Sequence, residues 1–146
     1  MVDWTIIIKI EIMTREDKML LIKDLSSRLP YAVHIQHTSG FSGILHDISI
    51  RHKYDGNDNI YDAICYTDFL GDGDSITIEH FKPYLFPLSS MTEEQKQEYQ
   101  YITERWMHDS SYSISDSIDW LNKNHFDYRN LIDKNLAIDA TGLNIY

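Results

Sequence analysis

The chain has little cysteine and lacks the features that would place it in a membrane or outside the cell. Cys65 is its one cysteine, so no disulfide can form within the chain, and a reducing compartment fits. No apolar run approaches the roughly 20 residues that a bilayer-spanning helix needs. No stretch shows the basic, apolar and small-residue order of a secretory signal. The sequence therefore predicts a cytoplasmic protein without a membrane segment.

Basic residues are also scarce. Thirteen Lys and Arg stand against 23 Asp and Glu, which gives a net charge of −10. Residues 1–30 hold five of each sign, so the whole acidic excess lies after them. Because a nucleic-acid binder must neutralise phosphates with Lys and Arg, this balance argues against direct nucleic-acid binding. Two interpretations stay open: the acidic surface only keeps the protein in solution, or an acidic face occupies a basic groove on another protein.

Patterns of common catalytic and cofactor sites are missing. Neither the phosphate-binding pattern G-x-x-x-x-G-K-[ST] nor the dinucleotide pattern G-x-G-x-x-G occurs. Ser42 lies between Gly40 and Gly43, one residue short of a G-x-S-x-G nucleophile elbow. Cys65 belongs to an alternating apolar pattern, which is typical of a buried thiol. We therefore predict no catalytic residue, no cofactor and a function other than catalysis.

The histidines and aspartates of the first half are candidate metal ligands by residue type. His34 and His37 have the spacing of a ligand pair, but an odd separation places them on opposite faces of a strand. Asp68, Asp72 and Asp74 do not follow the EF-hand order of oxygen ligands. We expect turn and surface roles for these residues and no metal ligand. A small metal-dependent hydrolase that uses these His- and Asp-rich loops is the alternative.

The first half of the chain predicts one helix followed by a β-meander. Thr14 has the character of an N-cap, and Pro30 ends the helix near Arg28. Alternating apolar residues, between turns rich in glycine and aspartate, then predict short strands at 31–36, 44–50, 60–66 and 76–78. Such strands form an antiparallel meander that can curl into a partly open barrel. Residues 1–12 are either a further strand or a leader that is not native to the protein.

Two prolines mark the change to an α-rich half. We call residues 83–91 the proline segment and expect it to be a stiff link. A capping box at either Ser90 or Thr92 starts the helices that follow. Asp127 is expected to cap the last of them, with Asn135 in the left-handed conformation at its end. Helices are predicted over 92–108, around 114–121 and over 127–135.

These patterns together predict a single α+β domain over residues 13–146. Its N-terminal helix and small antiparallel β-meander occupy 13–82. The proline segment follows at 83–91, and the C-terminal helices occupy 92–146. A domain of this length is large enough to bury its own hydrophobic core.

Aromatic and acidic residues suggest where a partner would bind. The chain has ten tyrosines and three tryptophans, and some of these must be exposed. Tyr and Trp are favoured at protein interfaces, and acidic side chains complement a basic partner. The sequence therefore predicts a partner-binding surface in the helical half, formed by Glu104, Tyr112, Asp116, Asp119 and Asp127.

Three stretches resemble a known family. They are the start Met13–Lys18 (MTREDK), the stretch Lys82–Gln95 (KPYLFPLSSMTEEQ) and the tail His125–Arg129 (HFDYR). With them the chain resembles a family of small proteins from gut Bacteroidales genomes and from their phages and prophages, over about residues 13–143. The resemblance supports Met13 as the native start. It implies a setting on mobile elements, where small acidic proteins such as anti-CRISPR proteins inhibit host machinery, and it implies no activity, cofactor or catalytic residue.

The resulting hypothesis is a non-enzymatic interaction protein of phage, prophage or mobile-element origin. It would bind and inhibit a host protein with a basic nucleic-acid-binding groove, such as a CRISPR or other defence component. The alternatives are the metal-dependent hydrolase named above and a structural accessory protein of a virion.

Overall fold

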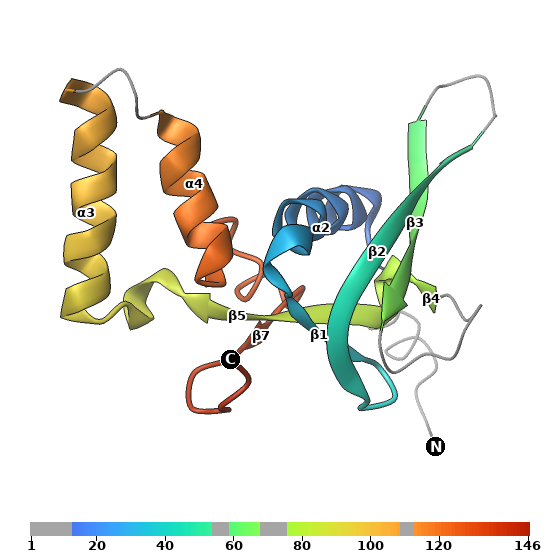
Figure 1. The fold of residues 1–146 in the computed structure, drawn as a ribbon. Coiled ribbons are helices and arrows are strands. Elements are labelled where there is room, and N and C mark those ends of the chain that lie inside the picture. Colours follow the sequence, from blue (N-terminus) through green and yellow to red (C-terminus); the bar gives the residue numbers. More distant parts are fainter. Residues whose placement is uncertain (1–12, 54–58, 68–75, 109–112) are drawn as a thin grey trace.

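The computed structural model describes residues 13–53, 59–67, 76–108 and 113–146. They form helices and one mixed sheet, the α+β class that the sequence predicts. Residues 1–12, for which a leader and a further strand were both considered, lie outside the described part of the chain. Figure 1 shows helix α2 above the middle of the sheet, a two-helix hairpin at one end and the β2–β3 hairpin at the other.

Helix α2 (Arg15–Arg28) begins and ends where the sequence predicts. The Thr14 hydroxyl accepts a hydrogen bond from the backbone N–H of Asp17 at 3.1 Å, which caps the helix start. The 3₁₀ turn η1 (Leu29–Tyr31) follows, and Ala32, with a φ of 53°, turns the chain into the sheet. The face of α2 that meets the sheet buries Leu21, Ile22 and Leu25.

The predicted antiparallel meander is confirmed. Consecutive strands pair in the order β1 (His34–His37), β2 (Ser42–Lys53), β3 (Asn59–Thr67) and β4 (Ile76–Thr77). Strand β2 is long enough to serve two partners, because its first residues pair with β1 and those from Leu45 onward pair with β3. Within the described residues the sheet runs in the order β4-β3-β2-β1-β5-β6 and is not closed into a barrel.

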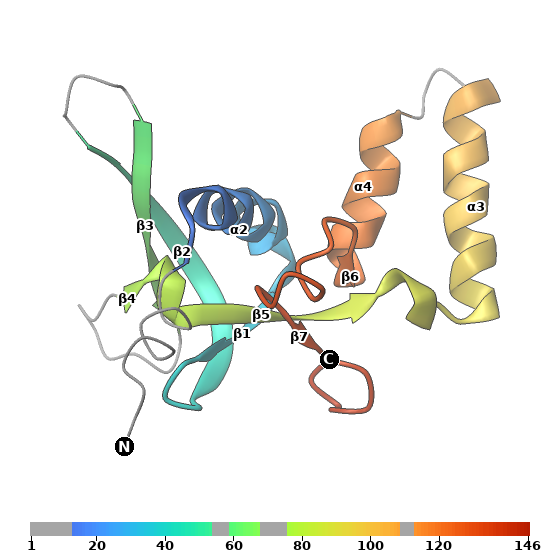
Figure 2. The ribbon, with the colours of Figure 1, turned by 180° about the vertical axis from the view of Figure 1, so that it is seen from behind.

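The proline segment is a correction to the predicted architecture. Residues Phe81–Pro87 form strand β5, which lies inside the sheet. One edge of β5 pairs antiparallel with β1, and the other pairs parallel with β6 (Phe126–Asp127) and β7 (Ile138–Asp139), as Figure 2 shows from behind. A proline removes only one N–H donor, and the burial of its neighbours Phe81, Tyr84 and Leu85 outweighs that loss.

Helix α3 (Glu93–His108) follows the 3₁₀ turn η3 (Leu88–Ser90), and α4 (Ile114–Lys123) runs back beside it. The structure resolves the capping alternative in favour of Thr92. The backbone N–H of Gln95 donates to the Thr92 hydroxyl at 3.1 Å, and the Thr92 N–H donates to the Gln95 side chain at 2.9 Å.

The predicted helix over 127–135 does not form, and turns take its place. Asn130 has a φ of 59°, in the left-handed region, which interrupts the helix in its middle. Asn135 also has a φ of 59°, as predicted for the residue at the end. The local signals at its end were nevertheless correct, because the backbone N–H of Leu136 donates to the carbonyl of Leu131 at 2.8 Å. The chain folds back there, but without a helix before the turn.

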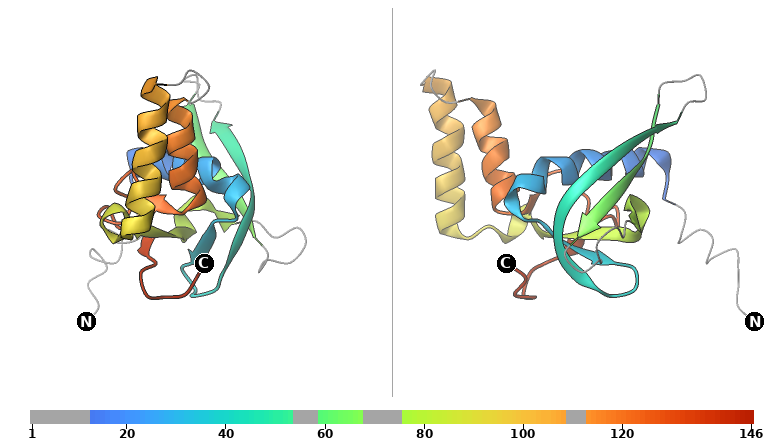
Figure 3. Two further views of the ribbon diagram at one scale, coloured as in Figure 1. Left: turned by 60° about the vertical axis from the view of Figure 1, so that its left-hand side comes forward. Right: turned by 45° about the vertical axis from the view of Figure 1, so that its right-hand side comes forward.

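The apolar interior consists of two clusters. The large one lies between α2 and the sheet, and it includes Cys65, which is fully buried as predicted. The small one joins the α3–α4 hairpin to the end of β5 and centres on Trp120, Leu121 and Phe126. The hairpin lies to one side of the main body, which the right-hand view of Figure 3 shows.

Candidate docking surface

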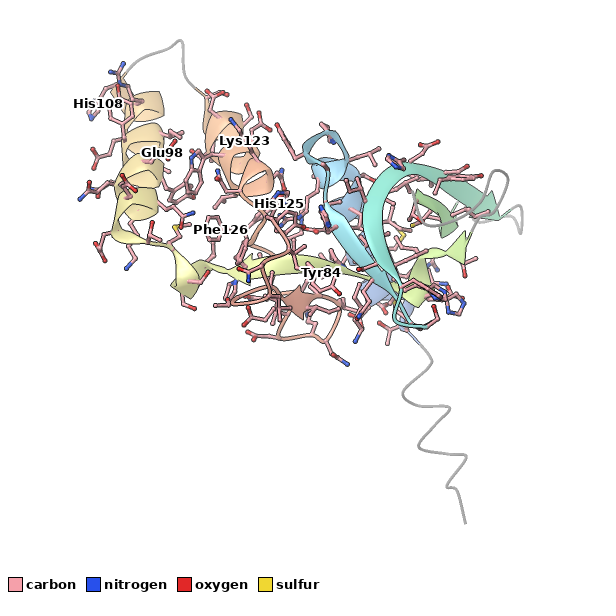
Figure 4. The ribbon with its side chains drawn as sticks, turned by 60° about the horizontal axis from the view of Figure 1, so that its bottom comes forward. Tyr84, Glu98, His108, Lys123, His125 and Phe126 are labelled. Atoms are coloured by element: carbon pink, nitrogen blue, oxygen red, sulfur yellow. The ribbon has the colours of Figure 1, made fainter. Side chains whose placement is uncertain are left out.

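The hairpin of α3 and α4 is attached to the body by aromatic contacts. The Trp120 ring lies 5.4 Å from that of Tyr99 on α3 and stacks on Phe126 at 5.7 Å, measured between ring centroids. None of the α3 side chains that the structure describes is fully buried. Figure 4 shows labelled side chains, Glu98 and His108, along α3, apart from Tyr84 in the middle of β5. The described side chains of α3 are therefore all at least partly exposed to solvent.

Large apolar side chains are exposed on this hairpin. The exposed fractions are 52% for Tyr101, 61% for Ile114 and 40% for Ile118. Ile114 and Ile118 are four residues apart, so they share one face of α4. Leu121, on the same helix, is buried at 5% exposure. The helix turns Trp120 and Leu121 inward, and the two isoleucines remain in water.

Acidic side chains accompany these apolar residues. The two helices carry the carboxylates of Glu93, Glu94, Glu98, Glu104, Asp116 and Asp119. Against these stand Lys96, Arg105 and Lys123. Lys96 already pairs with Glu93 at 3.2 Å, and the Arg105 guanidinium lies 4.6 Å from the centre of the Tyr101 ring. The hairpin is therefore net negative.

Glu104 and Asp119, both predicted as partner-binding residues, are exposed on this hairpin. Glu104 accepts a hydrogen bond from the side chain of Gln100 at 2.9 Å, one turn earlier on α3. Both carboxylates can reach a partner. Tyr112, another predicted residue, lies outside the described part of the chain.

Asp116 stabilises the start of α4. Its carboxylate accepts a hydrogen bond from the backbone N–H of Ser113 at 2.7 Å, and together they form the capping box that begins α4. Its side chain is half-buried. A carboxylate near a helix N-terminus is also stabilised by the helix dipole, so its position is explained without a partner.

Asp127 is buried, with 6% exposure, and both carboxylate oxygens are occupied. They accept hydrogen bonds from the backbone N–H groups of Leu131 and Ile132, each at 2.9 Å. Asp127 therefore caps a turn, as its sequence context predicted, although no helix follows it. This geometry leaves the side chain no surface for a docking partner.

A cluster of charged side chains that the sequence did not predict is buried beneath α2. Arg28 and Asp24 on α2 are both fully buried, and their ion pair has an N–O distance of 2.8 Å. Arg28 also donates to the carbonyl of Phe126 at 2.6 Å, while Arg129 approaches Asp24 at 3.3 Å. Burial raises the pKa of the Asp24 carboxyl, and the two guanidiniums act against that rise. The four-residue spacing of Asp24 and Arg28 was the signal available in the sequence.

His125 and Tyr146 form a second unpredicted contact. Their rings stack with centroids 3.6 Å apart. The Tyr146 hydroxyl donates to the carbonyl of Tyr84 at 2.8 Å and accepts from the backbone N–H of His34 at 3.0 Å. Burial, followed by the nearby charge of Arg28, lowers the pKa of His125 to about 4. Burial raises the pKa of Tyr146 to about 12.

The described residues that the sequence raised as candidates do not come together as a metal site. Among the described residues, no group of three or more His, Cys, Asp or Glu side chains lies close enough to hold a metal ion. His34 contacts Tyr146, whereas His37 contacts Phe81, so the two histidines have separate surroundings. Asp68, Asp72 and Asp74 lie outside the described residues.

No helix in the described ranges is long and apolar enough to cross a bilayer.

Comparison with protein-family models, with curated proteins and with solved structures finds no match to this chain.

Proposed function

We propose that this protein is a non-enzymatic interaction protein that docks the α3–α4 hairpin on a basic surface of another protein. One observation carries the proposal: Tyr101, Ile114 and Ile118 are exposed on a net-negative hairpin. Exposed aromatic and aliphatic side chains provide apolar area for an interface, and the carboxylates around them provide attraction and orientation. Glu104 and Asp119 are the charged residues that we assign to this contact.

The partner that fits this surface is a protein with a basic groove. Because carboxylates can occupy the place of nucleic-acid phosphates, a nucleic-acid-binding host protein matches the charge. The resemblance of Met13–Lys18, Lys82–Gln95 and His125–Arg129 to proteins of Bacteroidales genomes, phages and prophages is our reason to propose a mobile-element setting. A CRISPR or other defence component is the partner class that we propose. The genes adjacent to this one test that setting, since defence or replication genes favour it and capsid genes favour the virion alternative.

Site-specific cross-linking tests the docking surface. A photo-reactive residue at Ile118 in the full chain is expected to capture one host protein, and the same residue at the exposed Asp133, outside the hairpin, is expected to capture none. The captured protein is then purified and its affinity measured. We expect binding to weaken as salt rises, because charge attraction is screened within about 10 Å at 0.1 M salt.

Charge reversal provides the matched comparison. Glu104→Lys is expected to weaken binding about fivefold, whereas Asp133→Lys, which changes the net charge equally, leaves it unchanged. Equal effects of the two variants would show that only net charge matters and would refute a docking site on the hairpin. An affinity that does not change with salt would refute the acidic character of the contact.

A further inference from the structure

At the opposite end of β5 from the hairpin, the surface holds an open cavity of about 360 Å³. It lies where the end of β1, the turn after it and the 3₁₀ turn η2 (Ile78–His80) meet the start of β5. Its lining residues are Gln36, His37, Thr38, Gly40, Glu79, His80, Lys82 and Ile138. Register places Gln36 directly opposite Lys82. We propose that this cavity binds a small oxyanion, a carboxylate or phosphate group.

The hydrogen bonds of His37 decide what this ring can offer a ligand. The backbone N–H of Ser39 points at Nδ1 of His37 at 3.0 Å. A backbone amide can only donate, so Nδ1 must accept, and the proton of the neutral ring lies on Nε2. His37 is therefore a hydrogen-bond donor at its free nitrogen. Such a ring suits an oxygen ligand and is the wrong tautomer for a metal ion at Nε2.

Lys82 supplies a positive charge without a carboxylate partner among the described residues. Its ammonium donates to the side-chain oxygen of Asn135 at 3.0 Å, which leaves further N–H donors and the whole charge uncompensated. The one carboxylate of the lining, Glu79, is already paired with Lys18 at 2.9 Å. The cavity is therefore a locally positive site in a chain of net charge −10.

The backbone keeps these donors together. The N–H of Thr38 donates to the carbonyl of His80 at 2.9 Å, which ties the turn after β1 to η2. Gly40 has a φ of 99°, a conformation that a residue with a Cβ rarely adopts, so the shape of this turn requires glycine at that position. The His37 ring contacts Phe81 edge-on, with centroids 5.4 Å apart, and lies tilted beside the His80 ring at 6.0 Å. The site is thus formed by regular structure and a tight turn.

Titration with simple anions tests the proposal on the full chain. Inorganic phosphate and acetate, added separately up to about 50 mM at neutral pH, are expected to shift the NMR signals of His37 and Lys82 with saturation in the millimolar range. Chloride at equal ionic strength is expected to cause no saturating shift. Tighter binding of phosphate than of acetate would identify a phosphate group as the natural ligand, and the reverse order a carboxylate.

Variants of the lysine connect the binding to this cavity. Lys82→Met is expected to weaken anion binding about tenfold, since one charge-assisted hydrogen bond is lost. Lys82→Arg is expected to retain it, and His46→Gln, which changes an exposed histidine of β2 outside the lining, is expected to have no effect. Absence of saturation for both anions in the wild-type protein would overturn the proposal. So would equal affinity of the wild-type and Lys82→Met proteins, with NMR spectra confirming that both are folded.

Discussion

Asp24 and Arg28 show at the scale of single residues how burial constrains charge. Both side chains are fully buried, so neither charge can be solvated by water if the other is removed. The arginine also holds the carbonyl of Phe126, which connects α2 to the chain after α4. The pair therefore joins segments that are far apart in the sequence, and its loss affects more than one helix.

Asp24→Asn is expected to lower the free energy of unfolding by about 3 kcal/mol, because it leaves the Arg28 charge buried without a counter-charge. Urea denaturation measures the change. The control Asp133→Asn, at an exposed position, is expected to shift the midpoint little. A loss equal to that of the control would show that water reaches Arg28.

His125 gives the fold a pH dependence on the acid side. Its pKa is about 4 in the folded protein and about 6.5 in the unfolded chain, so the unfolded state binds more protons between those values. The stability that the neutral ring contributes is complete above about pH 6.5 and is lost as pH falls to about 4. Because the ring is only half-buried, we expect the loss to be on the order of 1–2 kcal/mol.

The measurement is the free energy of unfolding in urea at several pH values. His125→Asn, chosen because Asn tolerates the left-handed backbone at a φ of 62°, is expected to show a shallower loss over this range. Identical pH profiles of the variant and the wild-type protein would contradict the assignment.

At the scale of elements, caps distinguish structural from exposed carboxylates. Asp127 holds the turn after β6 through two backbone N–H groups, whereas Asp119 is exposed on α4. Asp127→Ala leaves both amides without their acceptor and is expected to cost about 2 kcal/mol. Asp119→Ala is expected to leave the thermal midpoint unchanged. The reverse order in thermal denaturation would show that the turn does not depend on its cap.

At the scale of the whole molecule, the two apolar clusters predict unequal stability. The main cluster includes fully buried side chains from α2 and the sheet. Of the described side chains of α3, Tyr99 and Ile102 pack on the small cluster and are only partly buried. Backbone amides of α3 are therefore expected to exchange with deuterium faster than those of α2 and β5, since local opening of the hairpin exposes little apolar surface. Equal protection of all three elements would show that the hairpin unfolds only with the body. A hairpin that opens independently can also adapt to a partner.

Much of the local structure could be predicted from the sequence, because it depends on neighbours in the chain. Thr14 and the stop before Pro30 define α2 through hydrogen bonds and sterics within a few residues. The alternation of apolar and polar residues between turns predicted the strands of the meander in the same way. The candidate site was predicted less well: Glu104 and Asp119 are exposed, but Asp127 is buried, because a carboxylate has the same sequence signal in a cap and on a surface.

The sequence by itself determined the α+β class, the order of helix and meander, the acidic balance and the burial of Cys65. Tertiary structure alone decided that Phe81–Pro87, which includes the first part of the proline segment, is a strand within the sheet, since its partners β1, β6 and β7 come from distant parts of the chain. It also decided that Lys82 and His37 line the same open cavity and that Ile114 and Ile118 remain in water. Such contacts depend on which distant surfaces pack together, and no pattern of neighbouring residues contains that information.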